Sequence, residues 1–103
     1  MFFTFLQNNS GGRWHKDANL DAVVIIEANS GPDANAKAQT LGIYFNGVRE
    51  GRDCRCCGSR WDEAGEGFEK PTLWEDPLEL LEKGTIIHYA DGRILRGEGQ
   101  RIA

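Results

Sequence analysis

Cysteine, histidine and proline are scarce in this chain, and long hydrophobic runs are missing. The 103 residues include 3 cysteines, 2 histidines and 3 prolines. All three cysteines fall within four consecutive positions, which argues against the spaced cysteine framework of a secreted disulfide protein. No run approaches a membrane-spanning length of about 18 apolar residues, and the first residues lack the basic leader of a signal peptide. The sequence therefore predicts a soluble intracellular protein with no membrane partner.

An excess of basic charge is missing as well. The formal net charge is −4 and the pI is about 5.1, whereas general nucleic-acid-binding domains are usually basic. The chain also lacks a nucleophile elbow, a Walker phosphate-binding loop and the H-E-x-x-H motif of metalloproteases. These absences argue against general nucleic-acid binding and predict a protein that is not an enzyme.

The hydrophobic pattern predicts one small domain that covers residues 1–103. β-Branched and aromatic residues predict six extended segments. They are residues 2–7, 22–28, 43–45, 71–74, 85–89 and 93–96, and the last two should form a hairpin. The unbroken apolar run within 22–28 is typical of a central strand that is covered on both faces.

Two helices are expected between these segments. Ser30 can cap the first, Pro32 suits its first turn, and Gly42 ends it. Asp76-Pro77 predicts the start of a second, short helix that ends at Gly84. The predicted fold is α+β, a mainly antiparallel sheet with one or two helices packed on it and a long cysteine-rich loop over residues 48–70.

The cysteines form the first candidate site. Cys54 and Cys57 are spaced C-x-x-C with Gly58 directly after, which is typical of a zinc knuckle that would order the long loop. A structural zinc ion takes four ligands, so the others would come from Cys56, a histidine or another chain. The candidate histidines are His15 and His88. Free thiols that behave as small hydrophobes and redox or disulfide chemistry are the alternative interpretations.

A second candidate site, for a phosphate or nucleotide, combines Arg52, Arg55, Arg60 and Trp61 with Asn8, Asn9 and Ser10. Arginine binds phosphate through its planar guanidinium, tryptophan can stack on a base, and a Gly-rich loop can direct backbone N–H groups at an anion. The alternative is that these arginines pair on a solvated surface with the neighbouring acidic residues Glu50, Asp53, Asp62 and Glu63.

Several strings in the chain resemble a family of small proteins without assigned activity that is widespread in tailed bacteriophages. They are NNSGG (8–12), VIIEA (24–28), LGIYFNGV (41–48), DCRCCGSRW (53–61) and IHYADG (87–92). The most specific is the D-C-x-C-C-G-x-R-W pattern. The resemblance implies a phage accessory protein in the cytoplasm of a bacterial host, and it transfers no catalytic residues. His88 lies within a shared string and His15 does not, which favours His88 as the fourth zinc ligand.

Two functions follow from these observations. The first is a non-enzymatic binding protein whose zinc-stabilised loop engages a host or phage protein. The alternative is a phage anti-defence binder, or sponge, of a nucleotide signal at the second candidate site. A homo-oligomer is also expected, because an exposed apolar strand at residues 2–6 could pair across a two-fold axis.

Overall fold

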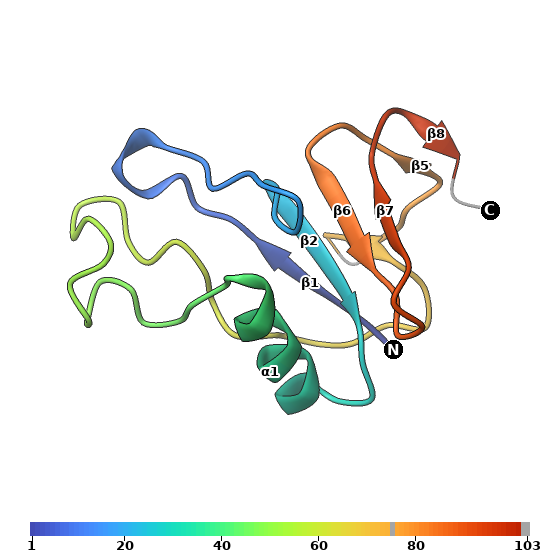
Figure 1. Ribbon diagram of the computed structural model, residues 1–103, viewed down its shortest axis with the longest axis horizontal. Helices are drawn as coiled ribbons and strands as arrows, with labels where there is room; N and C mark the ends of the chain where they lie inside the picture. The colour runs from blue at the N-terminus through green and yellow to red at the C-terminus, as the bar shows by residue number, and fades with distance from the viewer. Residues whose placement is uncertain (75, 102–103) are drawn as a thin grey trace.

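The computed structural model describes residues 1–74 and 76–101 (Figure 1). The predicted domain also includes residues 75, 102 and 103, which lie outside the described residues. The elements in chain order are β1 (Phe2–Leu6), a 3-10 turn η1 (Ser10–Gly12), β2 (Val23–Glu27), α1 (Gly31–Leu41), β3 (Thr72–Leu73), β4 (Asp76–Pro77), β5 (Leu80–Leu81), β6 (Thr85–His88), β7 (Ile94–Arg96) and β8 (Gln100–Arg101). The α+β class predicted from the sequence is confirmed.

Four strands form the main sheet, in the order β1-β2-β6-β7. β1 and β2 are antiparallel, with Phe5 opposite Val24, and β6 and β7 are antiparallel, as the predicted hairpin requires. β2 and β6 are parallel, with Val24 opposite Ile86. A parallel pair needs a crossover, and the chain between these strands carries α1 and the long loop. The sheet is therefore mixed, with mainly antiparallel pairing.

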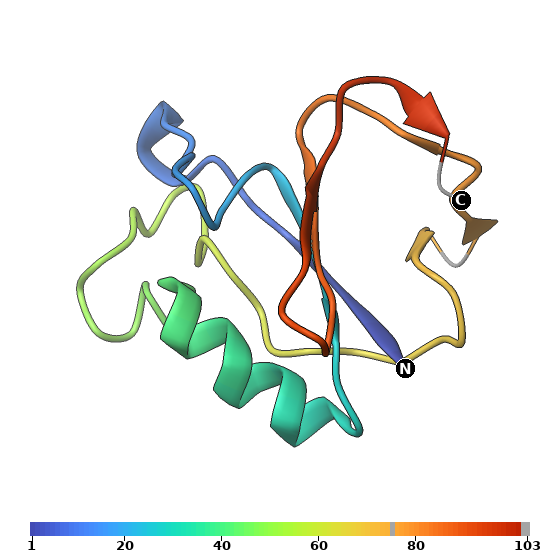
Figure 2. The same ribbon diagram turned by 45° about the vertical axis from the view of Figure 1, so that its right-hand side comes forward.

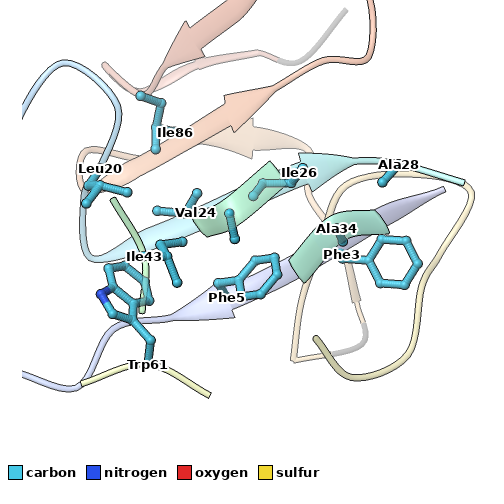
Figure 3. Packing of buried hydrophobic residues seen from close by; sticks show 11 residues of the cluster. Phe3, Phe5, Leu20, Val24, Ile26, Ala28, Ala34, Ile43, Trp61 and Ile86 are labelled. Carbon is cyan, nitrogen blue, oxygen red and sulfur yellow. The ribbon is translucent and has the colours of Figure 1, made fainter. Parts of the chain in front are cut away.

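β2 is the central strand that the apolar run predicts, and it is buried on both faces. Val24 and Ile26 face the cluster beneath α1, which Figure 3 shows from close by. Ile25 points the opposite way and packs with Leu81 and Ile87. Side chains of a strand alternate between faces, so an uninterrupted apolar run serves both clusters.

The first predicted helix is confirmed as α1. The Ser30 hydroxyl accepts a hydrogen bond from the Asp33 N–H at 3.2 Å, and Gly42 ends the helix with a φ of 109°. Ala34 and Ala38 are the buried positions, and their small side chains let the helix lie close to the sheet. Among the described residues, no helix has the length and apolar character needed to cross a membrane.

The second predicted helix is wrong. β4 and β5 occupy that segment, β4 pairing with β3 and β5 with β8. Leu80 is exposed and Leu81 is buried, which is the two-residue period of a strand. A helix of about two turns is marginal without tertiary support, and here the backbone instead finds partners in other strands.

Two expectations about extended segments also need correction. Residues 43–45 form no strand, because the Ile43 N–H bonds to the Ala38 carbonyl at the end of α1. β1 is an edge strand, but Phe2, Phe3 and Phe5 are buried rather than exposed. The backbone of Phe2 also pairs with that of Phe68, which covers one end of this edge.

Candidate functional site

Two loops lie side by side at one end of the molecule, in both views (Figures 1 and 2). One loop is residues 7–16 and the other is residues 44–60, and together they are called the paired loops below. The Asn8 N–H donates to the Arg60 carbonyl at 2.8 Å, and the Cys54 N–H donates to the Ser10 hydroxyl at 3.0 Å. The structure thus brings together the two sequence segments that form the second candidate site.

The Arg60 guanidinium lies between the paired loops, and its side chain is 7% exposed. Its Nη2 donates to the Ser10 carbonyl at 2.8 Å, and its Nη1 donates to the Gln7 Oε1 at 3.1 Å and to the Arg13 carbonyl. Its Nε donates to the Tyr44 hydroxyl at 3.2 Å. Because guanidinium donors are fixed in one plane, a single side chain sets the position of both loops.

Asp53 provides the buried counter-charge, and its side chain is 1% exposed. Its Oδ2 accepts from the Arg60 backbone N–H at 2.7 Å, and its Oδ1 accepts from the Tyr44 hydroxyl at 2.6 Å. Burial and the hydrogen bond to Asp53 raise the pKa of Tyr44 above its ordinary value. We call Gln7, Tyr44, Asp53 and Arg60 the Arg60 cluster. Its charges and hydrogen-bonding groups are paired with one another, as buried polar groups require.

The backbone at Gly47 lies directly against this cluster. A Cβ atom at this position would lie 1.7 Å from the Asp53 Oδ2 and 2.8 Å from the Tyr44 ring. The carboxylate cannot move away without losing its bonds to Arg60 and Tyr44. Glycine is therefore required at this position, because there is no room for a Cβ atom.

Trp61 follows Arg60 in the sequence but belongs to the apolar core. It is 1% exposed and lies in the cluster with Phe5, Val24 and Ile43 (Figure 3). Its indole Nε1 has no hydrogen-bond partner among the described residues. Consecutive side chains thus anchor the long loop twice, Arg60 in the polar cluster and Trp61 in the core. In this conformation neither side chain is presented on the surface to a ligand.

The other residues of the predicted nucleotide site are divided between surface and interior. Arg52, Arg55 and Asn9 are exposed, and the Arg52 guanidinium stacks 3.7 Å from the centre of the Tyr44 ring. Ser10 is buried, and the Asn8 side chain donates to the Cys57 carbonyl at 2.5 Å. Ser10 and Asn8 therefore hold the paired loops together, through their bonds to Cys54 and Cys57.

Cys54, Cys56 and Cys57 are exposed free thiols. The backbone N–H groups of Cys57 and Cys56 donate to the Cys54 sulfur and lower the pKa of that thiol. Gly58 donates its N–H to the Cys54 carbonyl at 3.0 Å and has a φ of 89°, which favours glycine. This turn, Cys54–Gly58, is called the cysteine turn below. It has the close backbone fold that the C-x-x-C-G pattern predicts.

The histidines lie in other surroundings. His15 is exposed, with its ring edge-on to Tyr44 at a centroid distance of 6.3 Å. His88 is 8% exposed, its Nε2 is 2.7 Å from the Asn19 carbonyl, and it lines a cavity of about 300 Å³ between α1 and the β6–β7 hairpin. Among the described residues, no three His, Cys, Asp or Glu side chains are grouped so that they could hold a metal ion. The chain therefore supplies no complete metal site in this conformation.

Sequence reasoning missed Tyr44 and Gln7 as members of the buried cluster. Both had a signal, because Gln7 ends the apolar segment 2–7 and Tyr44 lies within the apolar segment 43–45, where a polar group needs a hydrogen-bonding partner when it is buried. Asp53 was considered as a surface partner of the arginines. It does pair with Arg60, but in the interior.

Comparisons with known proteins assign the chain to a family. A search of curated proteins and a search of solved structures gave no match. Residues 1–102 match the family described as a domain of unknown function (DUF7296). The match includes the sheet, the Arg60 cluster and the cysteine turn, and its description names no ligand or reaction. The chain therefore belongs to the DUF7296 family.

Proposed function

We propose that this chain is a non-enzymatic binding protein that docks on a protein partner through its paired loops. The observation that supports this most is the buried Arg60 guanidinium, which bonds to Gln7 and Ser10 in one loop and to Tyr44 in the other. Removing two charges from water costs several kcal/mol per ion before their attraction is counted. Here the buried pair holds loops that have little secondary structure of their own, and rigid loops lower the entropy cost of binding.

The surface of the paired loops suits a protein partner. Trp14 is 45% exposed, and Arg13 and Arg55 are also exposed, each in one of the two loops. Tryptophan and arginine are enriched among the residues that contribute most to protein–protein binding. The resemblance to phage proteins adds the setting, a host or phage protein in the bacterial cytoplasm.

The proposal includes a structural zinc ion at the cysteine turn. Cys54 and Cys57 would bind it, and the remaining ligands would come from Cys56, from another chain or, if the chain rearranges, from His88 or His15. The support is the turn itself, which the bond from the Gly58 N–H to the Cys54 carbonyl closes and which carries exposed thiols. A metal there would stiffen the tip of a loop whose base the Arg60 cluster already fixes.

A nucleotide sponge has less support. The Arg60 donors are bonded within the protein, Trp61 is in the core, and the Ser10 N–H bonds to the Asn8 carbonyl. Arg52, Arg55 and Asn9 would have to provide the site. A thermal-shift screen against cyclic and ADP-ribose nucleotides tests this, because a bound ligand raises the melting temperature.

A pull-down with matched variants tests the docking proposal. The whole chain, a Trp14→Ala/Arg55→Glu variant and a Trp74→Ala variant would each be used as bait in lysate of a bacterial host. Trp74 is also exposed but belongs to the segment between β3 and β4, so it serves as the control. We expect one partner that is retained by the wild type and Trp74→Ala and lost with the double variant. Equal recovery by all three baits, or no specific partner, would contradict the proposal.

A further inference from the structure

We propose that Cys54 and Cys57 of two copies of this chain hold one zinc ion, which joins the copies at their cysteine turns. The inference rests on the zinc site of the proposed function and names the source of its missing ligands. Four thiolates around one ion form the tetrahedral set that structural zinc takes. Related by a two-fold axis, the two turns would contribute equally.

One chain supplies too few ligands for a closed site. A C-x-x-C turn directs two sulfurs to one ion, and in residues 1–74 and 76–101 no third metal-binding side chain is grouped with such a pair. His88 is held in β6 by its bond to the Asn19 carbonyl, and His15 packs against Tyr44. A second copy of the turn provides the two remaining sulfurs without rearrangement of the fold.

The backbone of the turn is already arranged to support thiolate ligands. The Gly58 N–H bonds to the Cys54 carbonyl at 3.0 Å, which closes residues 54–58 into the tight turn of a C-x-x-C-G knuckle. The turn is also held from beneath, because the Cys54 N–H bonds to Ser10 and the Cys57 carbonyl accepts from Asn8. Because the cysteine turn is already ordered before the metal binds, little conformational entropy is lost on binding, which favours high affinity for zinc.

The position of the turn allows a second copy to approach. All three thiols are exposed, and the loop that carries them forms the yellow-green end of the molecule in Figure 1. This end projects along the longest axis of a molecule whose extents are 40 × 27 × 24 Å. Two projecting ends can meet at one ion without contact between the sheets.

The charges around the turn match a tetrathiolate site. Binding of Zn²⁺ by four thiols releases four protons to solvent and leaves a centre with net charge −2. Arg49, Arg52 and Arg55 are exposed in the same loop and outnumber the exposed Glu50, since Asp53 is paired with Arg60. Without the thiolates, two such loops would repel each other, and the metal centre neutralises that repulsion.

Titration of the reduced whole chain with zinc, and with cobalt as a spectroscopic substitute, tests the proposal. We expect saturation at one metal per two chains, the absorption of a tetrahedral tetrathiolate with cobalt, and a sedimentation mass that rises from 11.5 kDa to twice that value. A chelator should return the mass to that of the monomer. Cys54→Ser and Cys57→Ser should each abolish the dimer, whereas Cys56→Ser should keep the same stoichiometry and mass.

Each other outcome contradicts the zinc ion shared between two copies, in a different way. One zinc per monomer would exclude the second copy and leave the zinc-stabilised loop of the proposed function intact. Absence of bound zinc would contradict both the zinc-bridged dimer and the zinc-stabilised loop. The pull-down would still test docking through Trp14 and Arg55 independently. Loss of binding in Cys56→Ser would show that a different sulfur set holds the metal. Tryptophan fluorescence from buried Trp61 establishes that each variant is folded.

Discussion

The sheet with α1 buries apolar side chains such as Ile25, Ile26 and Ile86, whereas the paired loops bury a charged pair, Asp53 and Arg60. The first region is held by burial in proportion to apolar area, about 25 cal/mol per Å². The second is held by directional bonds between a few polar atoms, each of which depends on the others. The sheet should therefore lose stability in steps as side chains are trimmed, and the loops should come apart together.

The dipeptide Arg60-Trp61 connects the paired loops with the sheet and α1. A substitution of Trp61 should therefore affect both regions and is the strongest test of the difference between them. Trp61→Ala removes a fully buried side chain from the core beneath α1, and such substitutions cost about 3–5 kcal/mol. Because the loop is anchored on the core through this residue, both regions should lose stability together. Urea unfolding followed by circular dichroism measures the loss. Trp14→Ala, at an exposed tryptophan, is the control and should change the free energy of unfolding by less than about 0.5 kcal/mol. If Trp61→Ala lowered the free energy of unfolding as little as Trp14→Ala, the core would not depend on the anchor that the loop provides through Trp61.

Arg60→Ala should separate the regions. It leaves the Asp53 carboxylate buried without its partner, and breaking a buried pair costs about 3–5 kcal/mol. We expect a value near the lower limit, since the loops can open and let water reach the carboxylate. Hydrogen exchange should show loss of protection at the amides of Asn8 and Cys54, while the amides of β2 and β6 stay protected. Arg60→Lys keeps the charge but not the planar donors, so it should recover only part of the loss. Uniform loss of protection in the sheet as well would contradict two separately held regions.

The difference between a region held by apolar burial and one held by directional polar bonds also explains which features could be predicted from the sequence. The apolar run of β2 and the Ser30 cap of α1 are local patterns with one structural meaning, and both predictions are confirmed. The Asp76-Pro77 start signal was also local, but β4 pairs with residues 72–73 just before it, and β5 pairs with the more distant residues 100–101. Pairing with other strands decided that segment, and the long-range pairing of β5 has no local signal in the sequence.

The candidate site was less predictable because arginine has the same appearance in a sequence whether it is buried or exposed. Arg52, Arg55 and Arg60 were treated as one group, although the first two are exposed and the third is buried. What distinguishes Arg60 is a set of acceptors from residues 7–13, about fifty positions earlier. The cysteine turn was predictable, because its C-x-x-C-G pattern specifies a local backbone shape.

Tyr44→Phe tests how much a single hydroxyl group contributes to the Arg60 cluster, and so how the polar region differs from the apolar one. The Tyr44 hydroxyl donates to Asp53 and accepts from Arg60, so its loss leaves two buried groups short of a partner. We expect a loss of about 1–2 kcal/mol in the free energy of unfolding near neutral pH. Leu41→Ala, at a half-buried position beside the core, serves as an apolar control without an effect on this cluster. No loss in Tyr44→Phe would show that the hydroxyl contributes nothing to the cluster.

The pH dependence of the same variant has a definite sign. The folded-state pKa of Tyr44 is raised by burial and by Asp53, so the protonated hydroxyl is the stabilised form. Its contribution is fully present below the unfolded pKa of about 10 and is lost as pH rises through the folded pKa. The stability difference between wild type and Tyr44→Phe should therefore be constant below about pH 10 and shrink as the pH rises above that value. Urea unfolding of both proteins below and above that value measures it, and a difference that grows with pH would contradict the assignment.

Arg52→Ala should have the smallest effect, although Arg52 touches the same tyrosine. Its guanidinium stacks 3.7 Å from the Tyr44 ring centre but is exposed, and an exposed cation–π contact contributes about 0.5–1 kcal/mol. We expect a loss of about 0.5 kcal/mol in the free energy of unfolding, with the protection of the Asn8 and Cys54 amides unchanged. A loss as large as that of Arg60→Ala would mean that the surface arginine also holds the loops. The contrast between these two arginines then measures how much of the loop order comes from burial rather than from charge.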